Sequence, residues 1–352
     1  MIKSWKVDIK KYFWCQDILL TEDIWPNFFI VGASRCGTTS LHEYLKTVPE
    51  IFMPDFKNPN FFGIYNKDNI NEEKEYLKLF QNARYCKAIG EASGYLRNLN
   101  SPELIFKKIP KAKIIIMLRN PIERTYSHYL GILRGGDEKM SFSEAFNKNM
   151  NPINEKSDFY QHYVKSSFYF QDVKKWISVF GTEQVKIIIF EEFIKDTRKI
   201  VKEILEFLEI KSDLPENVGK AYNEYAEPLG SLGTSIVENK TIKKFAKSII
   251  PGAKAKGMLR TVLNKKGKKP EIGEEQRKIL KKIFKKDIEE LSILLKKEIA
   301  WIWLSKMKLC VFPNDPIKAY YEKGEIKSRY FNPKNIFSEV HIITPTNNEI
   351  DG

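Results

Sequence analysis

A small polar loop near the amino terminus has the composition and spacing of a phosphate-binding loop. It runs from Gly32 to Thr39, follows the short apolar run Phe28–Val31, and precedes the helical spacing of Leu41, Tyr44 and Leu45. In a strand, loop and helix of this kind, backbone N–H groups and the helix dipole together bind an anionic phosphate. The sequence therefore predicts a phosphate site in this loop.

The charged residue of this loop differs from that of ATP-dependent P-loop enzymes. The GxxxxGK[ST] pattern has a lysine where this chain has Thr38, and the cation here is Arg35, inside the loop. The absence of that lysine argues against magnesium-ATP chemistry. A P-loop phosphotransferase ranks as the second interpretation, because it also needs an aspartate after a strand to hold the metal.

A second segment has residues that could bind another phosphate. Arg119 follows the apolar run Lys113–Leu118, and Ser127 lies two turns into a helix expected from about Glu123. At the carboxyl end of a buried strand, the paired donors of Arg119 and the hydroxyl of Ser127 can bind the same phosphate. Arg124 is as consistent with a surface role as with a ligand role.

The two segments together resemble the nucleotide-dependent sulfotransferases, in particular the carbohydrate and heparan-sulfate type. The phosphosulfate loop of that family reads approximately Pro-Lys-Ser-Gly-Thr-Thr after the first strand, and Ser34–Thr39 is similar to it. Arg119–Tyr129 is similar to the family's 3′-phosphate segment. Weaker landmarks extend the resemblance over roughly Phe28 to Trp303; they lie at Gly90–Ser93, Tyr169–Trp176, Glu191–Glu192 and Phe207–Leu208.

The resemblance implies that the chain uses 3′-phosphoadenosine 5′-phosphosulfate (PAPS) as its sulfuryl donor, without a metal. In the family a late basic loop covers the adenosine and the 3′-phosphate, and Lys265–Lys269 is our candidate; a solvated lysine surface is an equal alternative there. The residues expected to bind the donor are Ser34, Arg35, Cys36, Gly37, Thr38, Thr39, Ser40, Arg119, Ser127, Lys266 and Gly267.

The proton acceptor of the reaction is the least certain residue. Many carbohydrate-acting members carry a glutamate in a Lys-Glu-Pro segment, but this chain has Asn58 between Lys57 and Pro59, and an amide cannot act as a base. We favour Glu91, and His128 is the other candidate. Lys57 could hold an acceptor anion or the sulfuryl oxygens, although an exposed surface lysine is the more common case. The catalytic candidates are Glu91, His128 and Arg35. The resemblance places Arg35 on the leaving phosphate oxygen.

Apolar strands alternating with helices predict a P-loop-like α/β fold. The runs near residues 28–31, 113–118 and 185–190 are continuously apolar, which is typical of a parallel sheet covered by helices on both faces. Thr197 is a plausible N-cap, and Glu274 begins a long amphipathic helix in a helical C-terminal part. We expect an N-terminal extension at 1–24, a sulfotransferase domain at 25–305 and a C-terminal extension at 306–352.

The net charge of +14 is local. Residues 240–286 contain 17 Lys/Arg and three Glu, which accounts for the whole excess. A basic region of this kind attracts anions, so a non-enzymatic module that binds acidic polymers is a third interpretation, although no nucleic-acid motif is present.

The four dispersed cysteines indicate neither zinc nor disulfides, and no signal peptide is evident. We expect a cytoplasmic protein and leave peripheral membrane contact open.

The acceptor is expected to be a glycan or glycolipid. The terminal segment around residues 319–343 resembles the opening of certain glycosyltransferases, in which an apolar strand follows an Asn-Pro turn. That association with sugar chemistry favours a glycan acceptor. The aromatic residues between Phe159 and Phe170 could line an acceptor cleft, but at helical spacing they are more often part of the core.

Overall fold

The computed structural model describes most of the chain between residues 23 and 299, with gaps. The described residues are 23–63, 69–135, 138, 140–150, 152–220, 222, 227–228, 264–265, 271–299, 301, 308–311 and 339–342. The chain divides into two compact units. The first consists of Met1–Arg119, Tyr126–Phe142 and Gln171–Glu271, and the second of Asn120–Thr125, Ser143–Phe170 and Ile272–Gly352.

The first unit contains a five-stranded parallel sheet, which confirms the predicted α/β class. Its strands are β1 (Phe28–Gly32), β2 (Ile51–Phe52), β3 (Ala88–Ala92), β4 (Lys113–Leu118) and β5 (Val185–Ile189), in the order β2-β3-β1-β4-β5. β4 has the predicted bounds. β5 ends at Ile189 rather than at Phe190, because Phe190 begins a helix.

Burial on both faces explains why the central strands lack alternation. Every residue of β1 and β3 is buried, as are five of the six residues of β4. Phe29 of β1 lies beside Glu91 of β3 on one side and Ile114 of β4 on the other. A strand enclosed in this way gains from apolar residues at every position.

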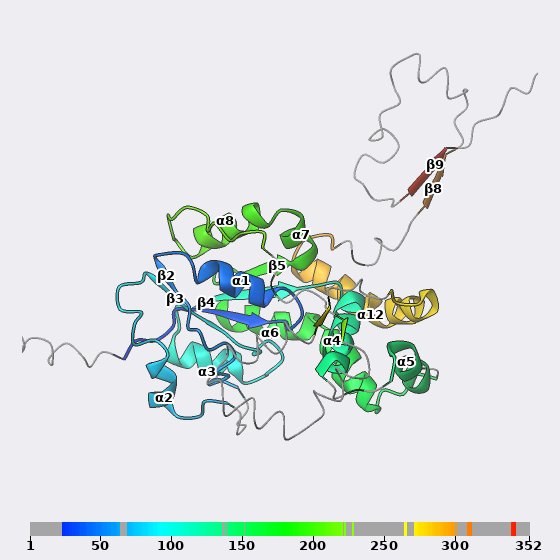
Figure 1. Ribbon diagram of the computed structural model, residues 1–352, viewed down its shortest axis with the longest axis horizontal. Coiled ribbons are helices and arrows are strands. Elements are labelled where there is room, and N and C mark those ends of the chain that lie inside the picture. The colour runs from blue at the N-terminus through cyan, green and yellow to red at the C-terminus, as the bar shows by residue number, and fades with distance from the viewer. Residues whose placement is uncertain are drawn as a thin grey trace, which may run out of the picture. The chain divides into compact units, whose positions relative to one another are not determined.

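Helices cover the sheet on both faces. They are α1 (Thr38–Leu45), α2 (Glu73–Lys78), α3 (Ser101–Lys108), α4 (Pro121–Gly135), α6 (Phe170–Phe180), α7 (Phe190–Lys195) and α8 (Thr197–Phe207). Figure 1 shows α1 and α8 on one face and α3 and α6 on the other. The chain passes from β1 to β2 in one direction along the sheet and from β3 to β4 in the other direction. Because parallel crossovers are right-handed, the helices of these two connections lie on opposite faces.

Two helix starts differ from the sequence prediction. α4 begins at Pro121, two residues before Glu123, since proline is favoured in the first turn, where its missing N–H costs nothing. The N-cap of α8 is Asp196 rather than Thr197, because the Asp196 carboxylate accepts the Lys199 backbone N–H at 3.0 Å.

Helices form most of the described part of the second unit. It contains nearly all of α5 (Phe142–Met150), a π-helical turn at Tyr160–Val164 and α12 (Glu274–Leu294), which begins where the sequence predicted. The Asp287 carboxylate on α12 accepts the backbone N–H groups of Tyr169 and Phe170 at 2.8 and 3.0 Å. The aromatic side chains at Phe159, Tyr160, Tyr163 and Tyr169 are buried, so this segment contributes to the core.

Arg124 also belongs to this second unit. Its buried guanidinium donates hydrogen bonds to the hydroxyls of Ser166 and Ser167. These contacts connect the first turn of α4 to the segment before α6, so the structure gives Arg124 a packing role. Neither the surface role nor the ligand role considered for it from the sequence fits this position.

Two short pairs of strands complete the described residues. β6 (Glu227–Pro228) is antiparallel to β7 (Asn264–Lys265), and β8 (Lys308–Val311) is parallel to β9 (Glu339–Ile342). The predicted donor residues Lys266 and Gly267 lie outside the described residues. Among the helices that are described, none is both long and apolar enough to cross a bilayer.

Candidate active site

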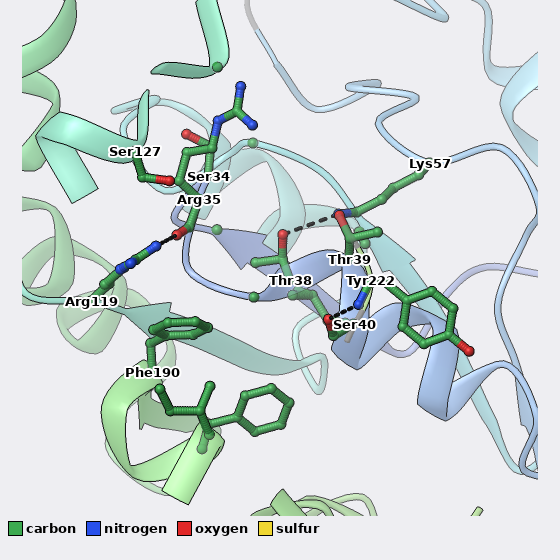
Figure 2. Close-up of a pocket in the computed structure, with 18 of the residues that line it drawn as sticks. Ser34, Arg35, Thr38, Thr39, Ser40, Lys57, Arg119, Ser127, Phe190 and Tyr222 are labelled. Carbon is green, nitrogen blue, oxygen red and sulfur yellow. Dashed lines mark hydrogen bonds between the residues drawn. The ribbon is translucent and has the colours of Figure 1, made fainter. Parts of the chain in front are cut away.

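A cavity of about 720 Å³ lies at the carboxyl ends of the central strands. Gly32 of β1, Ala92 of β3 and Arg119 just after β4 all line it (Figure 2). The chain leaves β1 toward one face of the sheet and β4 toward the other, so the cavity occupies the switch point at which open α/β sheets bind their ligands.

The predicted phosphate loop forms one wall of this cavity. Gly37 caps α1 with φ of 87°, and a Cβ added there would lie 3.0 Å from the Phe190 ring, so both the backbone conformation and the space require glycine. The Ala33 N–H donates to the Met117 carbonyl of β4 at 2.7 Å and fixes the start of the loop. The start of α1 therefore opens into the cavity, as an anion site requires.

The loop residues divide into those that face the cavity and one that does not. The lining residues are Ser34, Arg35, Gly37, Thr38, Thr39 and Ser40. Cys36 is fully buried, and its thiol donates to the Ser34 carbonyl at 3.6 Å. The predicted role of Cys36 in donor binding therefore has no support from its side chain, which packs beneath the loop.

Arg35 has an unusual conformation and direction. Its φ is 68°, and its carbonyl accepts a hydrogen bond from the Arg119 guanidinium at 3.2 Å. Its own guanidinium lies against Gly131 of α4, where no space remains for a Cβ. Figure 2 shows that this group points away from Thr38 and Thr39. The predicted contact of Arg35 with the leaving oxygen therefore stays a prediction: Arg35 lines the cavity, with its guanidinium beside Gly131.

Lys57 places an ammonium group on the loop instead. Its Nζ donates to the hydroxyls of Thr38 and Thr39 at 3.1 and 2.9 Å (Figure 2). Burial lowers the pKa of Lys57 to about 8, and the nearby Glu43 carboxylate opposes this shift. From the sequence alone, Lys57 could hold one of two anions or be an exposed surface lysine; in the structure its ammonium lies at the phosphate loop.

The second predicted anchor lines the same cavity. Arg119, Ser127 and His128 are all at its wall, with the Arg119 guanidinium 4.7 Å from the centre of the Phe190 ring. The ring face favours a cation at this distance and helps to orient Arg119. Two groups of anion-binding side chains, from the loop after β1 and the segment after β4, therefore face one cavity.

The sequence model of the family described as "Sulfotransferase domain" matches residues 26–292. This chain belongs to the sulfotransferase-domain family. The match lies inside the domain predicted at 25–305, whose boundaries remain a prediction. It confirms the predicted family and its enzyme class, and it favours sulfuryl transfer over both the phosphotransferase and the polymer-binding interpretations.

Several known proteins are similar to this sulfotransferase. Membrane-associated sulfotransferase kil1 of Dictyostelium discoideum is 33% identical over 105 residues, 30% of this chain and 22% of that protein. Carbohydrate sulfotransferase 15 of Mus musculus is 25% identical, with 53% and 44% covered. Bifunctional heparan sulfate N-deacetylase/N-sulfotransferase 1 of Mus musculus is 23% identical, with 79% and 30% covered. The chain thus spans less than half the length of these relatives.

A solved structure supports the same fold. The sulfotransferase from Alicyclobacillus acidocaldarius has a TM-score of 0.59 and 29% sequence identity, and the likeness covers 79% of this chain and 99% of that one.

Glu91 does not reach the cavity of this sulfotransferase. Its side chain is fully buried, and its Oε2 accepts the hydroxyls of Tyr76 and Tyr95 at 2.7 and 3.0 Å. Burial raises the pKa of Glu91 to about 7. The next residues, Ala92, Ser93 and Gly94, line the cavity while Glu91 does not, so the geometry gives no support to its predicted role as proton acceptor.

The aromatic wall of the cavity was missed from the sequence. It consists of Tyr44, Phe190, Phe193 and Tyr222. The Tyr222 N–H donates to the Ser40 hydroxyl at 3.2 Å, and its ring lies 6.0 Å from that of Tyr44. The Phe190 position was visible from the sequence only as the end of a strand, and Tyr222 had no local signal, because its contact with α1 joins residues 182 positions apart.

Proposed function

We propose that this sulfotransferase moves the sulfuryl group of PAPS to a hydroxyl or amine of a glycan. The observation that carries the proposal is the single cavity lined both by the phosphate loop and by Arg119 and Ser127. A nucleotide with one anionic group at its 5′ end and another at its 3′ position fits two such anchors. The aromatic wall supplies flat apolar faces suited to the adenine between them.

The reaction that this arrangement supports is an in-line displacement. A lone pair of the acceptor oxygen or nitrogen forms a bond to sulfur while the bond from sulfur to the bridging oxygen breaks. The electron pair of the broken bond stays on the 5′-phosphate of the departing 3′-phosphoadenosine 5′-phosphate (PAP), and the acceptor loses its proton to a base. The chain's tasks are to hold the two reactants in line, to stabilise the negative charge and to accept that proton.

His128 is the base that we propose. It is the one imidazole among the described residues that line the cavity, and no described carboxylate lines it. Asn58 also lines the cavity, but its amide has no basic site. An imidazole can accept a proton near neutral pH.

The glycan acceptor rests on the relatives. Carbohydrate sulfotransferase 15 and the heparan sulfate N-sulfotransferases carry acceptor sugars in their names, and each matches at least half of this chain. The cytoplasm is the location that we propose, because neither of the described cysteines, Cys36 and Cys86, forms a disulfide. Fractionation of cells that express the full chain tests the location: recovery of the protein outside the cytoplasm would contradict it.

A transfer assay with radiolabelled PAPS tests the function. The acceptors would be desulfated heparan sulfate chains with free hydroxyls, the same chains with free amines, and a small phenol as a non-glycan control. We expect label on the polysaccharide with the wild-type chain and at least about 100-fold less with Arg119→Ala. Label on the phenol alone would contradict the glycan acceptor, and no transfer to any acceptor class would contradict the reaction.

A further inference from the structure

Two cations are within reach of the phosphate loop, and they are oriented differently. The guanidinium of Arg35, the loop's own cation, lies against Gly131. The ammonium of Lys57 lies on the hydroxyls of Thr38 and Thr39, the first two residues of α1. The positive charge at the start of this helix, where the helix dipole also favours an anion, therefore comes from outside the loop.

The segment that carries Lys57 is held in place by backbone hydrogen bonds. The Asn58 N–H donates to the Ala92 carbonyl at the end of β3 at 2.9 Å, and the Asn60 N–H donates to the Ser93 hydroxyl at 3.1 Å. Because Asn58 and Asn60 are attached to the end of a core strand, the backbone that carries Lys57 over the loop is held in position. The rigidity reduces the entropy lost when the ammonium contacts a ligand.

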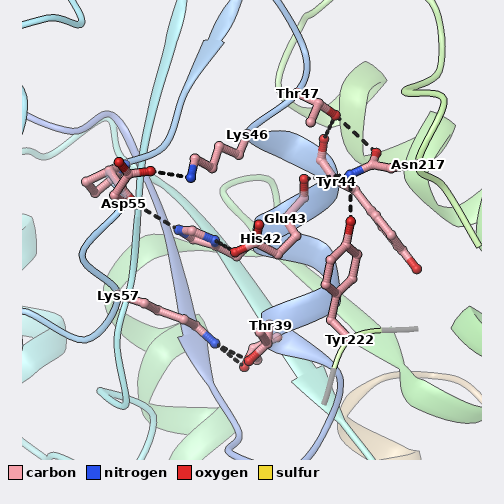
Figure 3. Close-up of polar contacts among 12 residues, drawn as sticks. Thr39, His42, Glu43, Tyr44, Lys46, Thr47, Asp55, Lys57, Asn217 and Tyr222 are labelled. Atoms are coloured by element: carbon pink, nitrogen blue, oxygen red, sulfur yellow. Dashed lines mark hydrogen bonds and ion pairs between the residues drawn. The ribbon is translucent and has the colours of Figure 1, made fainter. Parts of the chain in front are cut away.

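The charge of Lys57 is only partly balanced by its surroundings (Figure 3). Among the described residues no carboxylate forms an ion pair with it, and its two hydrogen-bond partners are neutral hydroxyls. Glu43 acts on it from a distance, while the adjacent His42 ring, bonded to Glu43 and to the Pro54 carbonyl, contributes no negative charge. A half-buried ammonium without a counter-ion is stabilised by an arriving anion.

We propose that Lys57 is a donor-binding and catalytic residue whose ammonium moves from the hydroxyls of Thr38 and Thr39 onto the oxygens of the phosphosulfate at the 5′ end of PAPS. This inference rests on the proposed function and identifies the cation that the 5′ end meets. Released from Lys57, both threonine hydroxyls can donate to the same oxygens. The ammonium then offsets the negative charge that develops on the leaving phosphate as the bond to sulfur breaks.

The proposal predicts that the ligand's 5′ group and Lys57 depend on each other. PAP carries both phosphates, whereas adenosine 3′-phosphate lacks the 5′ group. Lys57→Met should weaken PAP binding by about 10- to 100-fold, as expected for a lost charge-assisted hydrogen bond, and change adenosine 3′-phosphate binding by less than about twofold. Lys46→Met is the control, since Lys46, at the C-terminal end of α1, pairs with Asp55 at the surface.

Proton uptake gives a second readout that a packing role would not alter. The pKa of Lys57 is about 8 in the free protein, and an adjacent phosphate raises it. At about pH 8 the wild-type chain should therefore take up a fraction of a proton when PAP binds. Other titratable or charged groups lie around the site: His42, Glu43, Arg35 and His128. A Lys57→Arg variant is therefore needed to assign the proton uptake to Lys57. Arginine keeps the charge but is already protonated, so uptake should disappear while part of the affinity remains.

The experiment is calorimetric titration of the full chain with each nucleotide at about pH 8 in two buffers of different ionisation enthalpy. Weaker PAP binding in Lys57→Met with unchanged adenosine 3′-phosphate binding, together with loss of uptake in Lys57→Arg, supports the proposal. Equal effects on both nucleotides, or uptake that persists in Lys57→Arg, overturns it. If Lys57→Met does not fold, the Lys57→Arg result decides. If wild type binds neither nucleotide, the proposed function itself fails and this proposal falls with it.

Discussion

Lys57 and Glu91 are two ionisable side chains whose pKa values burial shifts, and their contacts give them different tasks. Lys57 faces the cavity and lies on two loop hydroxyls. Glu91, on the neighbouring strand, accepts two tyrosine hydroxyls inside an aromatic cluster and does not line the cavity. A shifted pKa alone does not identify a catalytic group, because structural carboxyls in apolar surroundings shift as well.

Glu91→Gln should leave turnover within about threefold of wild type, because Glu91 does not line the cavity; the loss of a base in the reaction would lower turnover at least about 100-fold.

Glu91→Gln should also change the pH dependence of stability. The folded pKa of Glu91 is raised from 4.5 to about 7, so its contribution is complete below 4.5 and is lost as the pH rises through about 7. We expect the wild-type free energy of unfolding to fall by up to about 3 kcal/mol more than that of the variant over this window.

Denaturant unfolding at several pH values measures the stability difference, and a radiolabel assay measures turnover. Tyr85→Phe, at an exposed side chain away from the cluster, is the control. A large loss of turnover in Glu91→Gln with intact folding would return Glu91 to the role of proton acceptor.

His128→Gln tests the proposed base at the cavity wall. We expect PAP binding within about twofold of wild type and a decrease in kcat of about 100-fold, because a lost general base slows the chemical step while the binding contacts remain. The measurements are calorimetric binding and the pH profile of kcat. Unchanged turnover would exclude His128, and a matching loss of PAP affinity would assign it to donor binding.

Parallel strands bring the two predicted anchors together. The segments after β1 and β4 are more than eighty residues apart, yet both follow the carboxyl ends of adjacent strands and line one cavity. The start of α1 depends on Gly37, whose positive φ and contact with Phe190 of α7 leave no space for a side chain. The phosphate loop and α1 therefore pack against α7, the helix after β5, at one glycine.

Gly37→Ala should lower the free energy of unfolding by about 1–2 kcal/mol, because alanine is strained at this φ and its methyl group would press on the Phe190 ring. PAP affinity should fall with it, since the loop N–H groups lose their alignment. Gly94→Ala, also at the cavity wall but with nothing within 4 Å of the added carbon, should unfold as wild type does. Equal stability of the two variants would contradict this account of the loop.

The elements that the sequence predicted well are those with local causes. Continuous apolar runs identified β1 and β4 because both faces of these strands are buried, a similar run identified the edge strand β5, and the amphipathic pattern from Glu274 identified α12. The order of the strands and helix α7 were not predicted, because they depend on long-range packing. The same distinction explains the site: the loop and Arg119 have motifs, whereas the direction of Glu91 and the position of Tyr222 are set by contacts distant in sequence.

The charge of the whole chain bears on its acceptor. The excess of +14 belongs to residues 240–286, most of which lie outside the described residues. A positive field of this kind raises the rate at which anionic ligands arrive, and salt screens it. An acidic glycan therefore has an advantage over a neutral one at low salt.

The KM for an acidic polysaccharide acceptor should rise about tenfold or more between low salt and about 0.3 M salt, whereas that for a neutral oligosaccharide should change by less than about threefold. Steady-state assays at saturating PAPS separate the acceptor from the donor, which is itself anionic. An equal response of both acceptors would show that the basic region does not contact the acceptor.

The proposed reaction depends most on the binding of both anionic ends of the donor in one cavity. Calorimetric titration with PAP, alongside ATP with magnesium and the Arg119→Ala variant, tests it directly. We predict tight binding of PAP that needs no metal and is lost in Arg119→Ala. Failure to bind PAP, or a preference for magnesium-ATP, would contradict the account.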